Sequence, residues 1–542
     1  MMRTIAMPLI LGFLVVAPSA AFAENEGQAD LDKATELQLR SKSLADVERV
    51  VKLCESALEK GLDEANMAFA RDLLVSALWQ HADGLTGAIF RRPGAEPRWR
   101  LIRSLALQDL DKIAKYNDAF ADAYLLRAKL LALPEGNPGD ALKAASTAVE
   151  LLAQDNKRRA QALILRAQLQ ENSEKRLADL DEAIKSDPSN AKAWQTRAAH
   201  FIQKGELDKA IEDFKAMLAQ NPENIAIRQA LAEALLNLDK PELALEHIEK
   251  AIEMAPDVPM NHTLRAEILE AQDKIPDALA ALNRALEVEP KDLVALLMRS
   301  RLHFLEEDLT AARADVNTAL DIRPGLTRGI ILRSMISAAQ GRFQDAIKDI
   351  LMILDVDRGN VELRLQLASL YVADQRPRKA VGLLTDILKK DKDNWMALRS
   401  RADARLSVGK HAEAIDDYNV ALKLQPEDGG ILNNLAWVLA TSPKDDLRDA
   451  KRAIELATKA CEVTNYEKSH ILSTLAAAHA ENNDFEAAIK WSTKAVTLGR
   501  EQGQEQLEQM EKELESYKKG EKWRELQEVE EKPDPPRNII ET

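Results

Sequence analysis

Cysteine is scarce in this chain of 542 residues, which contains two, Cys54 and Cys461. Both fall on the apolar faces of predicted helices. The helices predicted between them hold their Cα atoms far beyond the ~7 Å that a disulfide allows. We therefore expect two buried, unreactive thiols and no disulfide.

Motifs that carry chemistry are also missing. None of the eight histidines pairs with another at the i,i+3 or i,i+4 spacing of a helical zinc site. The sequence has no glycine-rich phosphate loop, nucleophile elbow or dinucleotide fingerprint. Two turns rich in Asp and Asn resemble calcium loops, but Gln366 and Ala402 stand where each loop requires a glutamate. The sequence therefore predicts no cofactor, no metal site and no catalytic residue.

An excess of positive charge is absent, because the formal net charge is −15. Nucleic-acid binding needs a positive surface, so the composition argues against it. Beyond the N-terminus, no stretch is long and apolar enough to cross a bilayer. We expect other proteins as partners, no nucleic acid and no transmembrane segment.

The N-terminus has the features of a secretory signal peptide. Arg3 supplies a positive charge, Ile10–Val16 form a short apolar run, and residues 21–23 form a small-x-small cleavage site before Glu24. We predict a signal peptide over residues 1–23 and an exported protein that is periplasmic or secreted.

Proline recurs in the chain with a fixed period of 34 residues. The prolines of this series are Pro188, Pro222, Pro256, Pro290 and Pro324, and Pro426 falls three periods later. A period of this length is typical of stacked repeats. With position 1 set at Ala191, position 20 of seven successive repeats is alanine: Ala210, Ala244, Ala278, Ala312, Ala346, Ala380 and Ala414. A small residue there allows two helices to pack closely.

The ends of the repeats carry helix-start signals. Position 34 is asparagine or aspartate in six of eight frames: Asn190, Asn224, Asp292, Asn360, Asn394 and Asp428. Such side chains accept a hydrogen bond from an unpaired backbone N–H, so we expect N-caps of the following helices. Pro241, Pro276 and Pro377 stand where second helices begin, a position that tolerates proline.

The repeat that begins at Ala191 resembles the tetratricopeptide repeat (TPR). The matching residues are Trp194, Ala198, Phe201, Gly205, Ala210, Phe214 and Pro222, whereas Met217 replaces the usual alanine. The resemblance implies an all-α, right-handed α-solenoid, a superhelix of stacked helix-turn-helix hairpins. After Arg500, apolar residues at helical spacing on a charged background predict a helix that covers the exposed end of the array.

We divide the chain on this basis into seven segments. They are a signal peptide (1–23), an irregular helical region (24–118), two irregular repeats (119–190), seven contiguous repeats (191–428), two further repeats of which the first has an insertion (429–502), a capping helix (503–532) and a disordered tail (533–542).

Arginine at position 7 and aspartate at position 23 tend to occur in the same repeat. The pairs are Arg166 with Asp179, Arg197 with Asp213, Arg299 with Asp315, Arg333 with Asp349, and Arg401 with Asp417. One interpretation is a ladder of arginines that binds an anionic ligand. The other is a charge-assisted hydrogen bond between the two helices of each hairpin, which we favour.

The family resemblance implies that positions 2, 5, 9 and 12 of the first helices line a concave groove. The candidate partner-binding residues are Gln195, Gln229, Glu233, Glu267, Leu297, Arg301, Ile331, Met335, Leu365, Arg399, Asp403, Asn433, Asn434 and Trp437. An apolar floor with charged edges suits a segment of another protein. Alternatively, neighbouring turns of the superhelix cover these residues, and Trp437 belongs to the core.

These observations lead to one main functional hypothesis and two alternatives. The first is a non-catalytic, exported scaffold that holds protein segments in its groove. The second is a self-associating structural protein of the cell envelope. The third is a regulatory subunit of an envelope enzyme complex.

Overall fold

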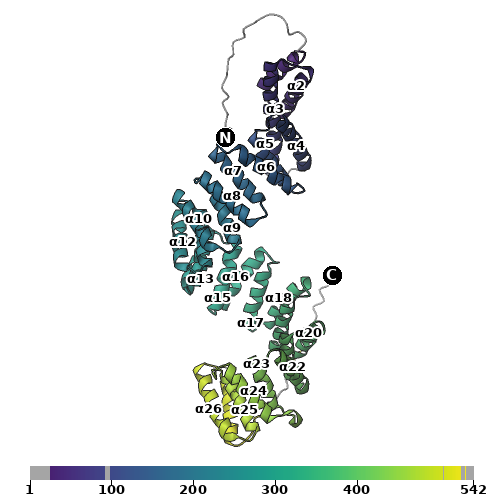
Figure 1. Cartoon of the computed structure of the whole chain (residues 1–542). Coiled ribbons are helices and arrows are strands. Elements are labelled where there is room, and N and C mark those ends of the chain that lie inside the picture. The colour runs from purple at the N-terminus through teal and green to yellow at the C-terminus, as the bar shows by residue number, and fades with distance from the viewer. Residues whose placement is uncertain (1–24, 92–97, 505, 526–530, 533–542) are drawn as a thin grey trace. The chain divides into compact units, whose positions relative to one another are not determined.

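The computed structural model describes residues 25–91, 98–504, 506–525 and 531–532. These residues form α-helices, one short 3-10 helix and connecting turns, with no β-strand among them (Figure 1). The chain divides into two compact units, residues 1–256 and 257–542. The predicted signal peptide and the predicted tail at 533–542 lie outside the described residues.

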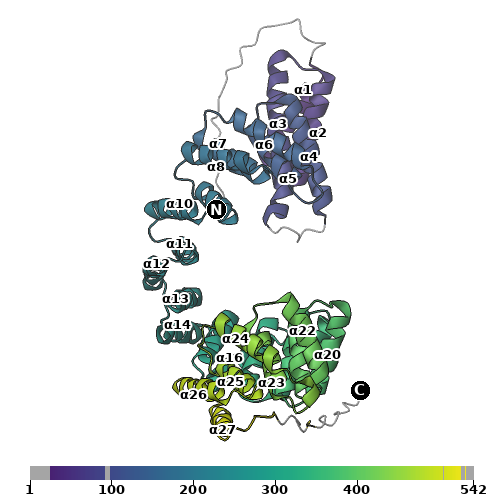
Figure 2. The same ribbon diagram turned by 60° about the horizontal axis from the view of Figure 1, so that its bottom comes forward.

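The first unit is a series of antiparallel helices, each packed on the next. Figure 2 shows α10, α11 and α12 following one another in this way. The helices are α1 (Gln28–Arg40), α2 (Leu44–Lys60), α3 (Glu64–Arg91), α4 (Trp99–Tyr116), α5 (Ala121–Leu131), α6 (Pro138–Leu151), α7 (Asn156–Leu169), α8 (Ser173–Ser186), α9 (Ala191–Gln203), α10 (Leu207–Gln220), α11 (Ile225–Asn237) and α12 (Pro241–Met254).

The second unit continues the same pattern of hairpins. Its helices are α13 (Pro259–Ala271), α14 (Ile275–Val288), α15 (Leu293–Leu305), α16 (Leu309–Ile322), α17 (Thr327–Ala339), α18 (Phe343–Val356), α19 (Val361–Ala373), α20 (Pro377–Lys390), α21 (Trp395–Leu406), α22 (His411–Leu424), α23 (Gly429–Thr441), α24 (Ala450–Val463), α25 (Ser469–Glu481), α26 (Phe485–Glu501) and α27 (Leu507–Lys518). The 3-10 helix η1 (Asp445–Leu447) occupies the predicted insertion between α23 and α24. The fold is therefore an all-α solenoid of stacked hairpins.

Small residues and capping side chains fix the geometry of each hairpin. All seven alanines at position 20 are fully buried. Each of the six residues expected at position 34 is an N-cap that accepts a backbone N–H, as Asn190 does from Lys192. Pro241 and Pro377 are the first residues of α12 and α20. These local predictions are confirmed.

The turn inside each repeat requires a left-handed backbone. Position 15 has a positive φ in all seven contiguous repeats, between 56° and 74°. Glycine occupies it in three of them, Gly205, Gly341 and Gly409. The other four carry a side chain there: Asp239, Asp273, Glu307 and Gln375. A residue with a Cβ is strained in this conformation, so these four turns are less stable than they could be.

A glycine lies inside a long helix of the first region, because α3 runs through Gly84 and on to Arg91. Leu44 packs close to the Cα of Gly84, so that a Cβ there would come within 2.5 Å of a Leu44 methyl carbon. The glycine thus allows a close approach between helices and does not end one. Cys54, on α2, is buried, and burial raises the pKa of its thiol to about 12.

The capping helix is shorter than the segment 503–532 assigned to it. Helix α27 ends at Lys518 and packs on α26 at the end of the stack (Figure 2). Gly520 has a φ of 73°, and the N–H of Glu521 donates to the carbonyl of Ser516. This is the hydrogen bond of a glycine-terminated helix end. The glycine therefore ends the helix, and residues 519–525 leave it as an extended strap.

Candidate functional site

A groove of about 760 Å³ and another of about 680 Å³ open on the surface of the second unit. The smaller one, which we call the central groove, is formed by the first helices α13, α15 and α17 and the turn that precedes α17. It brings together five of the predicted partner-binding residues: Glu267, Leu297, Arg301, Ile331 and Met335. Its floor is apolar, and its exposed side chains include Val294 and Met335.

One arginine at the edge of the central groove forms an ion pair, whereas two others form none among the described residues. Both terminal nitrogens of Arg301 donate to the Glu270 carboxylate at 2.5 Å. Glu270 raises the pKa of Arg301 through these hydrogen bonds. Arg323 and Arg328 are exposed, and within the described part of the chain their guanidinium groups make no ion pair. The groove therefore offers an apolar floor beside two available positive charges.

Other predicted groove residues lie elsewhere. Leu365 packs against the core cluster of the C-terminal repeats and does not line the central groove. Gln195 and Glu233 are exposed on α9 and α11 of the first unit, and Gln229 is half-buried on α11. Within the second unit, Leu365 is thus separated from the central groove.

A third set of predicted residues forms a polar network between α21, α22 and α23. Tyr418 donates its hydroxyl to the Asp403 carboxylate, and Asn434 donates its amide to the same oxygen at 2.9 Å. Asn433 donates in turn to Asn434 at 3.0 Å. Burial raises the pKa of Asp403, although both donors oppose the shift. These hydrogen bonds join α21, α22 and α23, although within the described residues the buried side-chain oxygen of Asn433 has no hydrogen-bond partner.

Arg399, which was predicted to line the concave groove, contacts the start of the following repeat. Its guanidinium donates to Asp428, the N-cap of α23, at 3.4 Å. It also lies against the backbone of Gly430, where a Cβ would come within 2.5 Å of it. Arg399 therefore bridges two repeats.

Trp437 is covered by the strap of residues 519–525. Its indole N–H donates to the Glu525 carboxylate, and the N–H of Glu525 donates to the carbonyl of Thr441 at 3.1 Å. Arg524 forms an ion pair with Glu481 at 2.7 Å, while Trp523 packs on the core cluster of the C-terminal repeats. The strap therefore occupies the surface at which a partner was expected to meet Trp437.

The same terminal segment makes contacts farther back along the chain. Arg378 donates to the Glu531 carboxylate at 2.7 Å, and the N–H of Lys532 donates to the carbonyl of Gln375 at 3.2 Å. Gln375 lies in the turn between α19 and α20, and Arg378 is the second residue of α20. Sequence reasoning missed the strap because its partners are far away in the chain; Gly520 was the local signal that the helix stops.

The structure brings all five Arg–Asp pairs together. In each pair the arginine Nε and one terminal nitrogen donate to the two carboxylate oxygens, as Arg299 does to Asp315 at 2.7 and 2.6 Å. The five aspartates are buried. Burial is the largest effect on Asp213 and raises the pKa of its carboxyl in spite of Arg197. The charges are paired inside the hairpins, so they do not form a ladder of free cations.

Several of these arginines also reach the preceding repeat. The remaining terminal nitrogen donates from Arg197 to Asp181 at 2.6 Å, from Arg299 to Asn283 at 2.7 Å, and from Arg401 to Thr385 at 3.2 Å. Asn283 and Thr385 are residues 25 of their repeats. The sequence carried this signal as a polar residue at position 25 before an arginine-bearing repeat, but it was not recognised.

The described residues offer no metal site and no membrane-spanning helix. No cluster of three or more His, Cys, Asp or Glu side chains in this part of the chain is arranged to hold a metal ion. No described helix has the length and hydrophobicity needed to span a membrane.

Comparison with known proteins gives a consistent match to one type of repeat. Two family models, both described as tetratricopeptide repeat, match residues 201–268 and residues 170–225, 263–327 and 365–429. The uncharacterized protein y4yS of Sinorhizobium fredii (strain NBRC 101917 / NGR234) is 34% identical over 90 residues, or 17% of this chain. The chain spans 50% of the length of that curated relative.

Solved structures with similar folds include two from bacteria. One is a tetratricopeptide repeat protein from Parabacteroides merdae, with a TM-score of 0.35, 18% identity, and coverage of 45% of this chain and 97% of that one. The other is PilF of Pseudomonas aeruginosa, with a TM-score of 0.33, 18% identity, and coverage of 39% and 96%.

Proposed function

The chain is a tetratricopeptide repeat protein, and on this premise we propose that it is a non-catalytic scaffold that holds a segment of another protein in the central groove. Arrays of this family provide extended surfaces for protein binding, and they are typically non-catalytic. The observation that carries the proposal is the central groove itself, where exposed apolar side chains lie beside Arg323 and Arg328.

The chemistry of the groove favours a particular kind of segment. Apolar anchors of the partner would cover Val294 and Met335, which are 59% and 43% exposed. A carboxylate of the partner would meet Arg323 or Arg328, because Arg301 is already paired with Glu270. An extended or helical segment with apolar residues and an acidic residue at one end satisfies both requirements.

The test is capture of partners by full-length protein carrying Val294→Glu and Met335→Glu. Both side chains are exposed, so the substitutions leave the hairpins folded. The control is Leu243→Glu on α12, which removes an equally exposed apolar side chain outside the groove. We expect the groove variant to lose its partners and the control to retain them. Unchanged capture by the groove variant would refute the assignment.

We propose further that residues 1–23 direct export and are removed. The basis is the sequence of the N-terminus alone. Fractionation of cells, followed by N-terminal sequencing of the protein, tests this. A protein in the exported fraction that begins at Glu24 supports the proposal, whereas a protein that keeps residues 1–23 in the cytoplasm contradicts it.

A further inference from the structure

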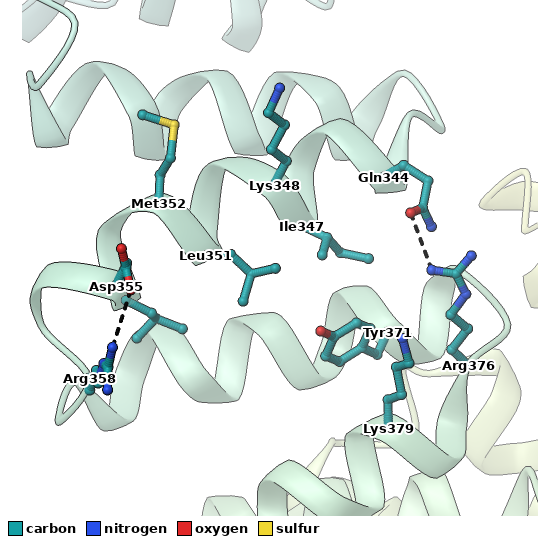
Figure 3. A pocket seen from close by; sticks show the side chains of 11 residues that line it. Gln344, Ile347, Lys348, Leu351, Met352, Asp355, Arg358, Tyr371, Arg376 and Lys379 are labelled. Carbon is teal, nitrogen blue, oxygen red and sulfur yellow. Dashed lines mark hydrogen bonds and ion pairs between the residues drawn. The ribbon is translucent and has the colours of Figure 1, made fainter. Parts of the chain in front are cut away.

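The larger groove of the second unit, drawn in Figure 3, is lined mainly by a second helix of a repeat, whereas first helices line the central groove. It is lined by one side of α18, by Tyr371 of α19 and by Lys379 at the start of α20. We call it the α18 groove. Figure 3 shows Leu351 on the side of α18 toward Tyr371, with Met352 and Lys348 on its other edge. Leu351 and Met352 are 44% and 45% exposed.

These two residues break the pattern of the other repeats. They occupy positions 25 and 26 of their repeat, which face solvent on the second helix. The residues at these positions in the other six contiguous repeats are Lys215 and Ala216, Glu249 and Lys250, Asn283 and Arg284, Asn317 and Thr318, Thr385 and Asp386, and Asn419 and Val420. Two large apolar side chains therefore occur together in one repeat of seven.

The arginine pairs do not account for this exception. A polar residue at position 25 accepts the hydrogen bond of the next repeat's arginine, and the repeat after Leu351 has Leu367 in place of that arginine. The repeat that begins at Ile225 also lacks the arginine, with Leu231 at position 7, yet it is preceded by Lys215. Loss of the arginine thus permits a charged residue at position 25 and does not require leucine.

The charge around the α18 groove is opposite to that of the whole protein. Its lining contains four basic residues, Lys348, Arg358, Arg376 and Lys379, and one acidic residue, Asp355. Arg358 is paired with Asp355 at 3.5 Å, and Arg376 donates to the side-chain oxygen of Gln344 at 3.2 Å (Figure 3). Arg376 is buried and also forms an ion pair with Asp374 at 3.2 Å. Lys348 is exposed, and in the part of the chain that the structure describes its ammonium group makes no ion pair. The formal net charge of the chain is −15, so a basic site is a local exception.

We propose that the α18 groove is a second docking site, which takes a segment of a partner protein that carries neighbouring apolar side chains flanked by carboxylates. The apolar side chains of the partner cover Leu351 and Met352, which line the groove together with Ile347 and Tyr371. Carboxylates of the partner lie against Lys348, whose opposite charge adds affinity and fixes the register. The site does not depend on the central groove, so the scaffold can hold two segments at once.

The test uses short fluorescein-labelled peptides and full-length protein, with binding measured by fluorescence anisotropy. The probe is an amphipathic helix of leucine and glutamate, and its two controls replace glutamate with lysine or leucine with serine. We expect the Leu–Glu peptide to bind roughly tenfold more tightly than either control, because both apolar burial and charge are needed. Equal binding of all three peptides would overturn the proposal.

Matched variants assign the binding to this groove. Leu351→Glu combined with Met352→Glu should weaken binding of the Leu–Glu peptide by at least about tenfold, because carboxylates then replace the apolar contacts. Val356→Glu is the control on the same helix, since Val356 is 91% exposed and does not line the groove. These variants are made in protein that already carries Val294→Glu and Met335→Glu, because the central groove also suits a segment with apolar and acidic residues. Binding of the Leu–Glu peptide that Leu351→Glu with Met352→Glu leaves unchanged in this background would refute the proposal.

Self-association is the competing outcome and is measured by sedimentation velocity over a concentration series. A mass that grows with concentration in the wild-type protein, and no longer grows in the Leu351→Glu, Met352→Glu variant, would assign the surface to a second copy of the chain and overturn the proposal. A mass that stays constant in both proteins supports a different partner.

Discussion

Arg299 and Asn283 belong to successive hairpins and are joined by a hydrogen bond of 2.7 Å from the arginine Nη1 to the asparagine Oδ1. The same guanidinium donates twice to Asp315 within its own hairpin. One planar side chain therefore fixes the packing inside a repeat and the contact with the preceding repeat. This arrangement gives the paired arginines a structural role.

Replacement of Arg299 by leucine should lower the free energy of unfolding by about 2–3 kcal/mol, because Asp315 is left buried without its partner. Chemical denaturation measures the change. The double variant Arg299→Leu, Asp315→Leu should recover much of it, since no unpaired charge remains.

Two controls separate this effect from loss of surface charge. Arg284→Leu removes an arginine that is 50% exposed and paired with exposed acids, so it should change stability by less than about 0.5 kcal/mol. Asn283→Ala removes the contact with the preceding repeat and keeps the Asp315 pair. An effect of Arg284→Leu as large as that of Arg299→Leu would contradict the proposed role.

The left-handed turns offer a stabilising change. Glu307 and Asp273 have φ values of 61° and 59°, and glycine adopts this conformation without strain. Glu307→Gly should raise the free energy of unfolding by roughly 0.5–1 kcal/mol, after the entropy gained by the unfolded chain is deducted. Thermal denaturation measures the shift.

The reverse substitution, Gly341→Ala, tests the same idea because Gly341 has a φ of 71° in the equivalent turn. It should be destabilising, whereas Gly359→Ala should have a smaller effect because that glycine lies outside the positive-φ region. Equal effects of the two alanine substitutions would show that strain at position 15 does not limit stability.

Glu513 on α27 should make the stability of the second unit depend on pH. Its carboxyl is buried, and burial raises its pKa, although Ser473 and Gln509 donate to it. The folded state therefore holds a proton that the unfolded state loses above a pH of about 4.5. The free energy of unfolding therefore falls as the pH rises from this value to the folded-state pKa of Glu513. Above that pKa it no longer depends on the titration of Glu513.

The matched variant for this prediction is Glu513→Gln, which cannot ionise. Thermal melts between pH 4.5 and 8 should show the wild type losing stability relative to this variant as the pH rises. Glu515→Gln on the exposed side of α27 is the control, since the pKa of Glu515 is lowered by Lys518. A constant difference between wild type and Glu513→Gln would refute the pKa shift.

The strap can be released by a single substitution. Glu525→Ala removes the acceptor of the Trp437 indole N–H, a loss of about 0.5–1.5 kcal/mol. Hydrogen exchange should then become faster at the amide of residue 525, which donates to the carbonyl of Thr441. Glu521→Ala, at the start of the strap, should leave this exchange unchanged. Protection that persists in Glu525→Ala would mean that Arg524 and Trp523 hold the strap without it.

The repeat architecture could be read from the sequence because its signals are local and periodic. The buried alanines at position 20 and the caps at position 34 each act within a few residues of the helices they define. The Arg–Asp spacing was visible for the same reason. In every full repeat that carries the pair, the two residues are 16 positions apart, as Arg299 and Asp315 are.

The surfaces could not be read in this way because they depend on contacts between distant residues. Repeat position put Trp437 in a groove, but Glu525, 88 residues later, covers it. Leu365 was assigned to the groove floor and packs on the core, because repeat position does not say how much of a side chain its neighbours bury. The α18 groove lies on second helices, which the family resemblance does not associate with binding.

In a linear array each repeat contacts only its neighbours, so its ends can fray one hairpin at a time. The C-terminal residues change this, because Glu525 and Arg524 contact α23 and α25, whereas Glu531 contacts Arg378 at the start of α20. The last hairpins can open only after these contacts with earlier repeats have broken. We therefore expect the C-terminal repeats to unfold cooperatively, in one transition.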